Sequence, residues 1–145
     1  MIPAAELTGR ELDTAVAREV CGYHIIENKT WPTSLERLPV GKTAYHLALR
    51  NGDWAPPNHS GTYGWGWTDS AEEAWTGVPN FSANLNACRD AEREIERRGL
   101  MPQYEAKLTT AVARLNDTAD RPIFLFMADA GTRCRAMIAA VRSAK

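Results

Sequence analysis

The stretch Ile123-Phe124-Leu125-Phe126-Met127-Ala128 gives the strongest strand signal in the chain and decides the expected fold. A continuous apolar run of this kind predicts a strand that is buried on both faces. A sheet with two apolar faces needs a cover on each side, and the rest of the sequence offers helices for that purpose. We therefore expect an α+β fold: a three-layer α/β/α sandwich with a small sheet of three to five strands and about three main helices.

Capping patterns predict where two helices begin. Ser/Thr-x-x-Glu boxes start at Thr8 and Ser70, and in such a box the hydroxyl and the carboxylate bond two otherwise unpaired backbone amides. They indicate helices over 9–21 and 71–75, and Gly22 is a natural end for the first. The spacing of Leu12 and the apolar residues after it supports that helix.

Two further helices follow from periodicity. A long central helix is predicted to run from Ser82, as its N-cap, to about Arg98, with a buried stripe that includes Cys88 and Ile95. A last helix is predicted over about 132–143, because apolar residues recur there at helical spacing.

The remaining elements are expected from shorter patterns. Residues 23–31 are rich in aromatic and β-branched side chains and predict a strand, and 34–38 suggests one helical turn. Residues 43–50 suit either a strand or a short helix, with alternation favouring a strand. Residues 104–115 fit both periods as well, which leaves a strand or a helix open there.

Three motifs occur in a particular order along the chain. Leu7-Thr8-Gly9-Arg10-Glu11-Leu12-Asp13 opens it, Val78-Pro79-Asn80-Phe81-Ser82-Ala83-Asn84-Leu85-Asn86-Ala87 lies in the middle, and Ala128-Asp129-Ala130-Gly131-Thr132-Arg133-Cys134-Arg135-Ala136 starts the last helix. This order resembles the phage ABA sandwich domain family. The resemblance implies a layered sandwich, a strand in the first half of 104–115, and a bacteriophage or prophage setting, and it implies no reaction.

Length and composition limit the class of protein. A chain of 145 residues is the size of one domain, so we expect a single domain over 1–145 with a glycine- and aromatic-rich loop insertion at about 51–77. A net charge of −1 gives no general attraction to nucleic acid or to an anionic membrane. We see no signal peptide and no apolar stretch that would span a bilayer. These absences and three scattered cysteines, expected to be buried thiols, favour a reducing cytoplasm, and the family resemblance implies that of a host bacterium.

Motifs of catalysis and metal binding are missing from the sequence. Gly41-Lys42-Thr43 invites a phosphate-loop interpretation, but Glu36 occupies the position where that motif needs a glycine. The histidines, at 24, 46 and 59, lack the spacing of metal ligands. We expect no catalytic residues, no metal and no cofactor, and therefore a binding protein more than an enzyme.

The segment 54–75 holds four of the five tryptophans, together with Tyr63 and His59, among flexible glycines. These rings suit a mini-core under a long loop, a set of faces that stack on a nucleobase, or an aromatic interface with another subunit. Anion binding has two candidates: the amides at Ser82 and Asn84, and those at Thr132 beside the guanidinium of Arg133. Either pair also suits a plain helix cap.

Arg89 has two interpretations, because its side chain can reach the first of these sites or pair with Glu92 three residues on. The candidate ligand-binding set is Trp54, His59, Tyr63, Trp65, Trp67, Phe81, Ser82, Asn84, Arg89, Thr132 and Arg133.

The sequence leaves two functions open. The first is a phage anti-defence protein that acts as a homo-oligomeric sponge and sequesters a cyclic oligonucleotide immune signal of the host. The second is an interaction module that binds a host or phage protein through the Trp-rich loop. No basic recognition helix is evident, so sequence-specific binding to nucleic acid is not expected, and neither is a membrane partner.

Overall fold

The structure is a computed structural model that describes residues 1–28, 43–52, 68 and 70–145. The chain divides into two compact units. We call Met1–Val20 with Asn80–Lys145 the helical unit, and Cys21–Pro79 the hairpin unit. The expected helical turn at 34–38 and the loop tip at 53–67 lie outside the described residues. A single domain over 1–145 stays a prediction.

The helical unit begins with a short 3₁₀ turn, η1 (Ala4–Glu6), and then α1 (Gly9–Ala15), which continues as a π-helical turn, η2 (Val16–Val20). The predicted helix over 9–21 is thereby confirmed. Leu12, Val16 and Val20 are fully buried along it. The predicted capping box is wrong, however: Thr8 is the N-cap residue but its side chain makes no capping hydrogen bond.

The predicted central helix is α3 (Leu85–Arg97), and it begins later than expected because Asn84 is its N-cap in place of Ser82. The Asn84 side chain accepts hydrogen bonds from the amides of Asn86, at 2.9 Å, and Ala87, at 3.1 Å. Asparagine is as strong an N-cap as serine, so the later residue with the better geometry starts the helix. Gly99, with φ +72°, ends it.

Residues 104–115 form a helix, which corrects the expected strand. They belong to α4 (Met101–Asn116), whose buried residues are Tyr104, Leu108 and Val112. These three lie four residues apart and therefore on one helical face. That face packs against α5 (Ala130–Ser143), so the helical period of the sequence outweighs its local alternation.

The expected strand over 123–128 is also wrong. Its centre is a 3₁₀ turn, η3 (Leu125–Met127), and the large side chains of Phe124 and Phe126 are exposed. A strand needs a neighbouring strand for its backbone groups, and the described part of the helical unit contains none. Side chains bond this backbone instead: Asn116 donates to the carbonyl of Ile123 at 2.9 Å and accepts from its amide at 2.6 Å.

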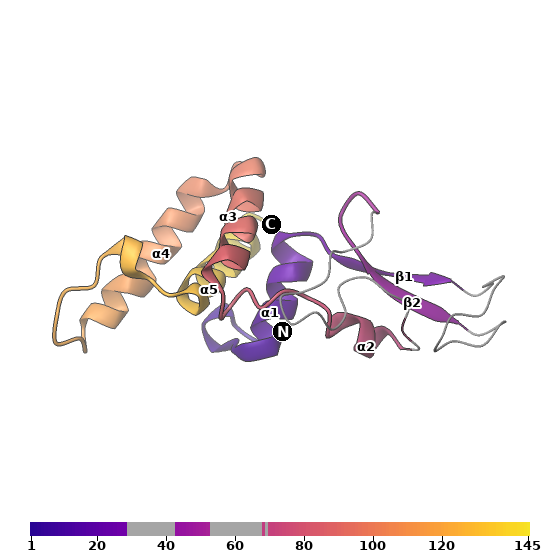
Figure 1. The fold of residues 1–145 in the computed structure, drawn as a ribbon. Coiled ribbons are helices and arrows are strands. Elements are labelled where there is room, and N and C mark those ends of the chain that lie inside the picture. Colours follow the sequence, from indigo (N-terminus) through magenta and orange to yellow (C-terminus); the bar gives the residue numbers. More distant parts are fainter. Residues whose placement is uncertain (29–42, 53–67, 69) are drawn as a thin grey trace. The chain divides into compact units, whose positions relative to one another are not determined.

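Helix α5 is the centre of the helical unit, and Figure 1 shows it among α1, α3 and α4. It also contacts η1 and η2. Cys134, Met137, Ile138 and Val141 are fully buried along it, at the helical spacing that predicted a last helix. The helix starts two residues earlier than expected because Asp129 is its N-cap and accepts a hydrogen bond from the Thr132 amide at 2.7 Å.

The hairpin unit contains β1 (His24–Asn28) and β2 (Ala44–Ala48), which pair in antiparallel fashion with Ile26 opposite His46. The strands expected over 23–31 and, more weakly, over 43–50 are both confirmed within the described residues. Helix α2 (Ala71–Trp75) packs against both strands, and the N-cap bond of its predicted capping box is present, since Ser70 Oγ accepts from the Glu73 amide at 3.1 Å.

The fold is therefore α+β, as expected, with a two-stranded antiparallel sheet among the described residues. A sheet of three to five strands is not found there, since two of the expected strands are α4 and η3. Within the part of the chain that the structure describes, every helix is too short or too polar to span a bilayer.

Candidate functional site

The aromatic half of the expected site lies outside the described residues. It comprises Trp54, His59, Tyr63, Trp65 and Trp67. Their role in stacking, in a mini-core or in an interface therefore stays a prediction. The other expected residues belong to the helical unit.

At the start of α3, the groups expected to hold an anion are bonded within the protein. The Ser82 amide donates to Asp13 Oδ1 at 2.7 Å, and the Asn84 side chain occupies the next amides as the N-cap. Phe81 is 2% exposed and belongs to the core. Arg89 is exposed on α3, and the carboxylate expected to pair with it, Glu92, binds Arg133 instead.

The start of α5 is capped in the same way. Thr132 is buried, and its amide donates to the Asp129 carboxylate. That hydrogen bond is the main reason why the pKa of Asp129 lies below its ordinary value, although burial opposes the shift. The capping carboxylate already supplies the negative charge that a helix N-terminus favours.

The structure does bring these two helix starts together. A cavity of about 480 Å³ lies between the starts of α1, α3 and α5, and Ser82, Asp129, Gly131 and Arg135 are among its lining residues. Its lining includes the Asp129 carboxylate, and the neighbouring amides of Ser82 and Thr132 are bonded to Asp13 and Asp129. The cavity thus joins two predicted sites whose amide donors are engaged.

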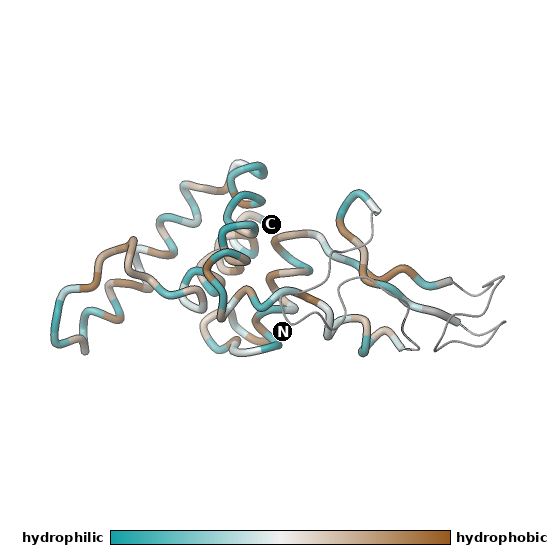
Figure 2. The backbone as a smooth tube through the Cα atoms, viewed as in Figure 1, coloured by the Kyte–Doolittle hydropathy of each residue, from teal (hydrophilic) through white to brown (hydrophobic). Residues whose placement is uncertain are grey.

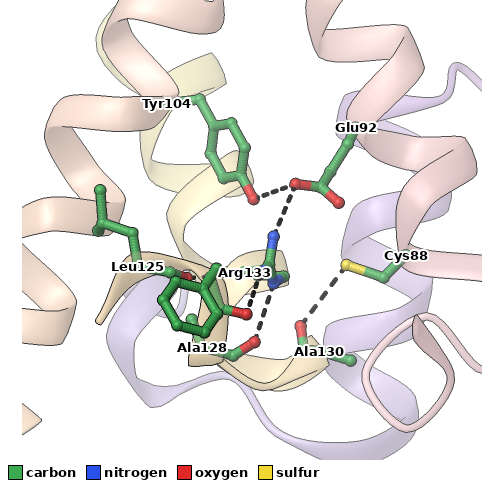
Figure 3. A network of polar contacts seen from close by, with 8 residues as sticks. Cys88, Glu92, Tyr104, Leu125, Ala128, Ala130 and Arg133 are labelled. Atoms are coloured by element: carbon green, nitrogen blue, oxygen red, sulfur yellow. Dashed lines mark hydrogen bonds and ion pairs between the residues drawn. The ribbon is translucent and has the colours of Figure 1, made fainter. Parts of the chain in front are cut away.

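Arg133 turns its guanidinium toward the protein, where it holds the segment before α5 (Figure 3). Its Nε donates to the Ala128 carbonyl at 2.9 Å, and its Nη2 donates to the carbonyls of Leu125, at 3.4 Å, and Phe126, at 3.1 Å. A guanidinium has five N–H donors in a fixed plane, so one side chain can fix several carbonyls at once.

The other side of this guanidinium meets a carboxylate. Arg133 Nη1 lies 3.2 Å from Glu92 Oε2, and the Tyr104 hydroxyl donates to the same oxygen at 2.6 Å. Burial and this hydrogen bond to Glu92 both raise the pKa of the Tyr104 hydroxyl well above its ordinary value. The phenol therefore stays protonated, and the network joins α3, α4 and α5 (Figure 3).

The segment that this network holds carries an exposed apolar surface. We call Phe124, Leu125, Phe126 and Met127 the apolar turn; their exposed fractions are 57%, 42%, 78% and 54%. The rings of Phe124 and Phe126 are stacked with centroids 5.8 Å apart. The segment has the hydrophobic colours in Figure 2, although it lies at the surface. Soluble proteins rarely leave four consecutive large apolar residues exposed without a binding role.

Sequence reasoning selected this segment for its apolar character and assigned it to the core. The residues that mark it as a surface turn are polar and lie outside the run, at Asn116 and Arg133. Their bonds to the turn follow from the three-dimensional fold. Arg135, which lines the cavity described above, was also missed as a candidate, because it stands one helical turn beyond the N-terminal residues of α5.

Among the described residues, no group of three or more His, Cys, Asp or Glu side chains is placed to hold a metal ion. All three cysteines are buried, as expected from the sequence. Comparison of the chain with protein-family models, with curated proteins and with solved structures gives no match. The likeness to the phage ABA sandwich family stays a prediction from the three sequence motifs.

Proposed function

We propose that this protein is a non-enzymatic binding protein that docks onto a protein partner through its apolar turn. The observation that carries the proposal is the exposure of four consecutive large apolar side chains on a segment with fixed backbone. This surface differs from the Trp-rich loop that the sequence offered for a protein interaction.

The energetics suit such a role. Burying one large apolar side chain against a partner contributes about 1.5–3 kcal/mol, so two phenylalanines and a methionine form an effective anchor. Arg133 donates to the carbonyls of Leu125 and Phe126 in the turn, and bonds to Ile123 and Ala128 hold its two ends before a partner binds. A surface that is ordered in advance loses less conformational entropy on binding, which raises affinity.

Site-specific photocrosslinking tests this function. A photoreactive phenylalanine analogue at position 126 should give a discrete crosslinked protein product in the cells that express the chain. The same analogue at Leu85, which is 51% exposed on α3, is the matched apolar control and should give none. If neither position crosslinks, or if both give the same products, the turn is not a specific docking surface.

A second candidate is favoured by one sequence observation, the concentration of four tryptophans within 54–75. Here the protein is a phage anti-defence sponge in the bacterial cytoplasm, which as a homo-oligomer sequesters a cyclic nucleotide signal by aromatic stacking. Native mass spectrometry with a panel of cyclic di- and trinucleotides tests it. Integral nucleotide masses should appear on the wild-type oligomer and be lost in Trp65→Ala and Trp67→Ala. An oligomer that gains no mass counts against the sponge.

A further inference from the structure

A second hollow of the helical unit lies along α4 and α5, with η1 at its edge. It is a groove of about 440 Å³, and we call it the α4–α5 groove. Five of its lining residues are alanines, whose small side chains leave the space open. Thr110 and Thr132 also line it. A volume of this size matches sites for small molecules.

The charged residues that line the groove are all positive. Its lining includes Lys107, Arg114 and Arg135, and it includes no carboxylate among the described residues. The side chains of Lys107 and Arg114 make no ion pair or hydrogen bond within the described part of the chain. The whole chain has a net charge of −1, so this concentration of positive charge is a local feature.

The three cations are spread along the groove by the two helices. Lys107 and Arg114 are seven residues apart on α4, which places them on one face about 10 Å apart along the helix axis. Arg135 comes from α5, and its Nη1 donates to the Leu7 carbonyl at 3.4 Å. Among the described residues this is the one hydrogen bond of the guanidinium, so most of its N–H donors are available to a ligand.

The neighbouring cavity at the helix starts contributes one carboxylate, that of Asp129. Asp129 lowers the net positive charge around Arg135, but its carboxylate is engaged as the N-cap of α5. Lys107 and Arg114 lie on the other helix of the groove. The electrostatic preference of the groove for an anion is therefore set mainly from the α4 side.

We propose that the α4–α5 groove binds a small molecule that carries several phosphate groups. Three cations in a space of about 440 Å³ suit a compact ligand with two or more negative charges. A planar guanidinium matches phosphate oxygens with two parallel hydrogen bonds, and a lysine contributes a point charge. The alanines give the uncharged part of such a molecule an apolar surface.

This site is independent of the apolar turn, because the lining of the groove includes none of the residues 124–127. It does bear on the second candidate function, since a nucleotide would bring the required phosphates. The test therefore measures polyphosphate binding directly and needs no assumption about the protein partner or the Trp-rich segment.

Isothermal titration with inorganic tripolyphosphate, ATP, adenosine and citrate at low salt tests the proposal. We expect tripolyphosphate and ATP to bind and adenosine not to bind, with an affinity that falls as salt increases. No binding of either polyphosphate at about 1 mM would overturn the proposal. Citrate binding as tightly as tripolyphosphate would overturn the assignment to phosphate.

Matched charge reversals locate the site. The double variant Lys107→Glu/Arg114→Glu should weaken tripolyphosphate binding at least about tenfold, because two charged contacts become repulsive. The control Arg93→Glu/Arg97→Glu makes the same change of net charge on α3, at exposed residues outside the groove lining, and should change the affinity less than about twofold. Equal losses in both variants would show general charge attraction and overturn the site.

Chemical-shift mapping on the wild-type protein locates the site even if a variant unfolds. On addition of tripolyphosphate to the wild-type protein, amide shifts should be concentrated at 107–115 and 132–139. Shifts centred on 82–87 would instead assign the ion to the cavity at the helix starts and contradict the groove.

Discussion

Arg133 Nη1 lies 3.2 Å from Glu92 Oε2, and this ion pair connects the first turn of α5 to the middle of α3. Both side chains are mostly buried, with exposed fractions of 18% and 22%. The same guanidinium also fixes the carbonyls of the apolar turn, so the surface segment and the helix packing depend on one residue. A partner that binds the turn would contact a segment already held by the core of the helical unit.

Arg133→Lys should therefore destabilise the helical unit. A lysine keeps the charge but lacks the planar fork that bonds Glu92 and three carbonyls at once. We expect the free energy of unfolding to fall by about 1–3 kcal/mol, as for loss of buried charged hydrogen bonds. Urea unfolding followed by the helical circular dichroism signal measures it. The control Arg93→Lys, whose ion pair with Asp90 is largely exposed, should cost less than about 0.5 kcal/mol. Equal effects would contradict the role of Arg133.

The N-cap of α3 offers a direct comparison of the expected and the observed helix start. Asn84→Ala removes the acceptor of two amide hydrogen bonds and should lower the free energy of unfolding by about 1 kcal/mol. Ser82→Ala should change it by less than about 0.5 kcal/mol, because the Ser82 hydroxyl makes no hydrogen bond among the described residues. If Ser82→Ala lowers the free energy of unfolding more than Asn84→Ala in the same urea experiment, Ser82 is the cap.

These residues show which parts of the fold can be predicted from the sequence. Helices with a buried stripe at regular spacing, such as the face of α5 that includes Met137 and Val141, were predicted because spacing alone places them on one side. The cap at Ser70 could also be predicted, since Glu73, whose amide bonds its side chain, lies three residues away. Local patterns failed at two helix starts, because the Thr8 side chain makes no capping hydrogen bond and Asn84 caps α3 in place of Ser82.

The other errors concern contacts that no helical or strand period indicates. Residues 123–128 have the composition of a buried strand, and only the absence of a described neighbouring strand and the bonds from Asn116 and Arg133 make them a surface turn. Tyr104 has alternating neighbours, yet its burial with Leu108 against α5 decides for a helix. The α4–α5 groove was not predicted for the same reason: Lys107 and Arg135 come from two helices that only the fold brings together.

Asp13 should be important for the packing of α1 against the start of α3. Its side chain is almost fully buried, accepts from the Ser82 amide at 2.7 Å and pairs with Arg10 at 3.1 Å. Asp13→Ala leaves the part-buried Ser82 amide without its acceptor, so we expect a loss of about 1–3 kcal/mol in the free energy of unfolding. Asp90→Ala, on an exposed carboxylate, should cost less than about 0.5 kcal/mol. Thermal and urea unfolding of both variants would reveal any failure of this contrast.

Phe126, which is exposed, and Phe81, which is buried, should respond differently to truncation to alanine. Phe126 is 78% exposed, so Phe126→Ala should lower the free energy of unfolding by less than about 1 kcal/mol, which covers its stacking on Phe124. Phe81 is 2% exposed, and Phe81→Ala should cost about 3–5 kcal/mol because it leaves a cavity. A large loss of stability in Phe126→Ala would mean that the turn is part of the core and would remove the basis for docking.

The stability of the hairpin unit should decrease as the pH falls below about 6.5, because of His46. Burial, and secondarily the charge of His24, hold the pKa of His46 below its ordinary value of 6.5. The unfolded chain then binds a proton at a pH where the folded chain does not, so protonation favours unfolding as the pH falls from 6.5 to the folded pKa. Amide exchange of β1 and β2 between pH 5 and 8 measures this, corrected for the intrinsic dependence of exchange on pH. His46→Leu should flatten the profile, and His24→Gln should reduce the slope only in part. A wild-type profile that matches His46→Leu would exclude His46 as the cause.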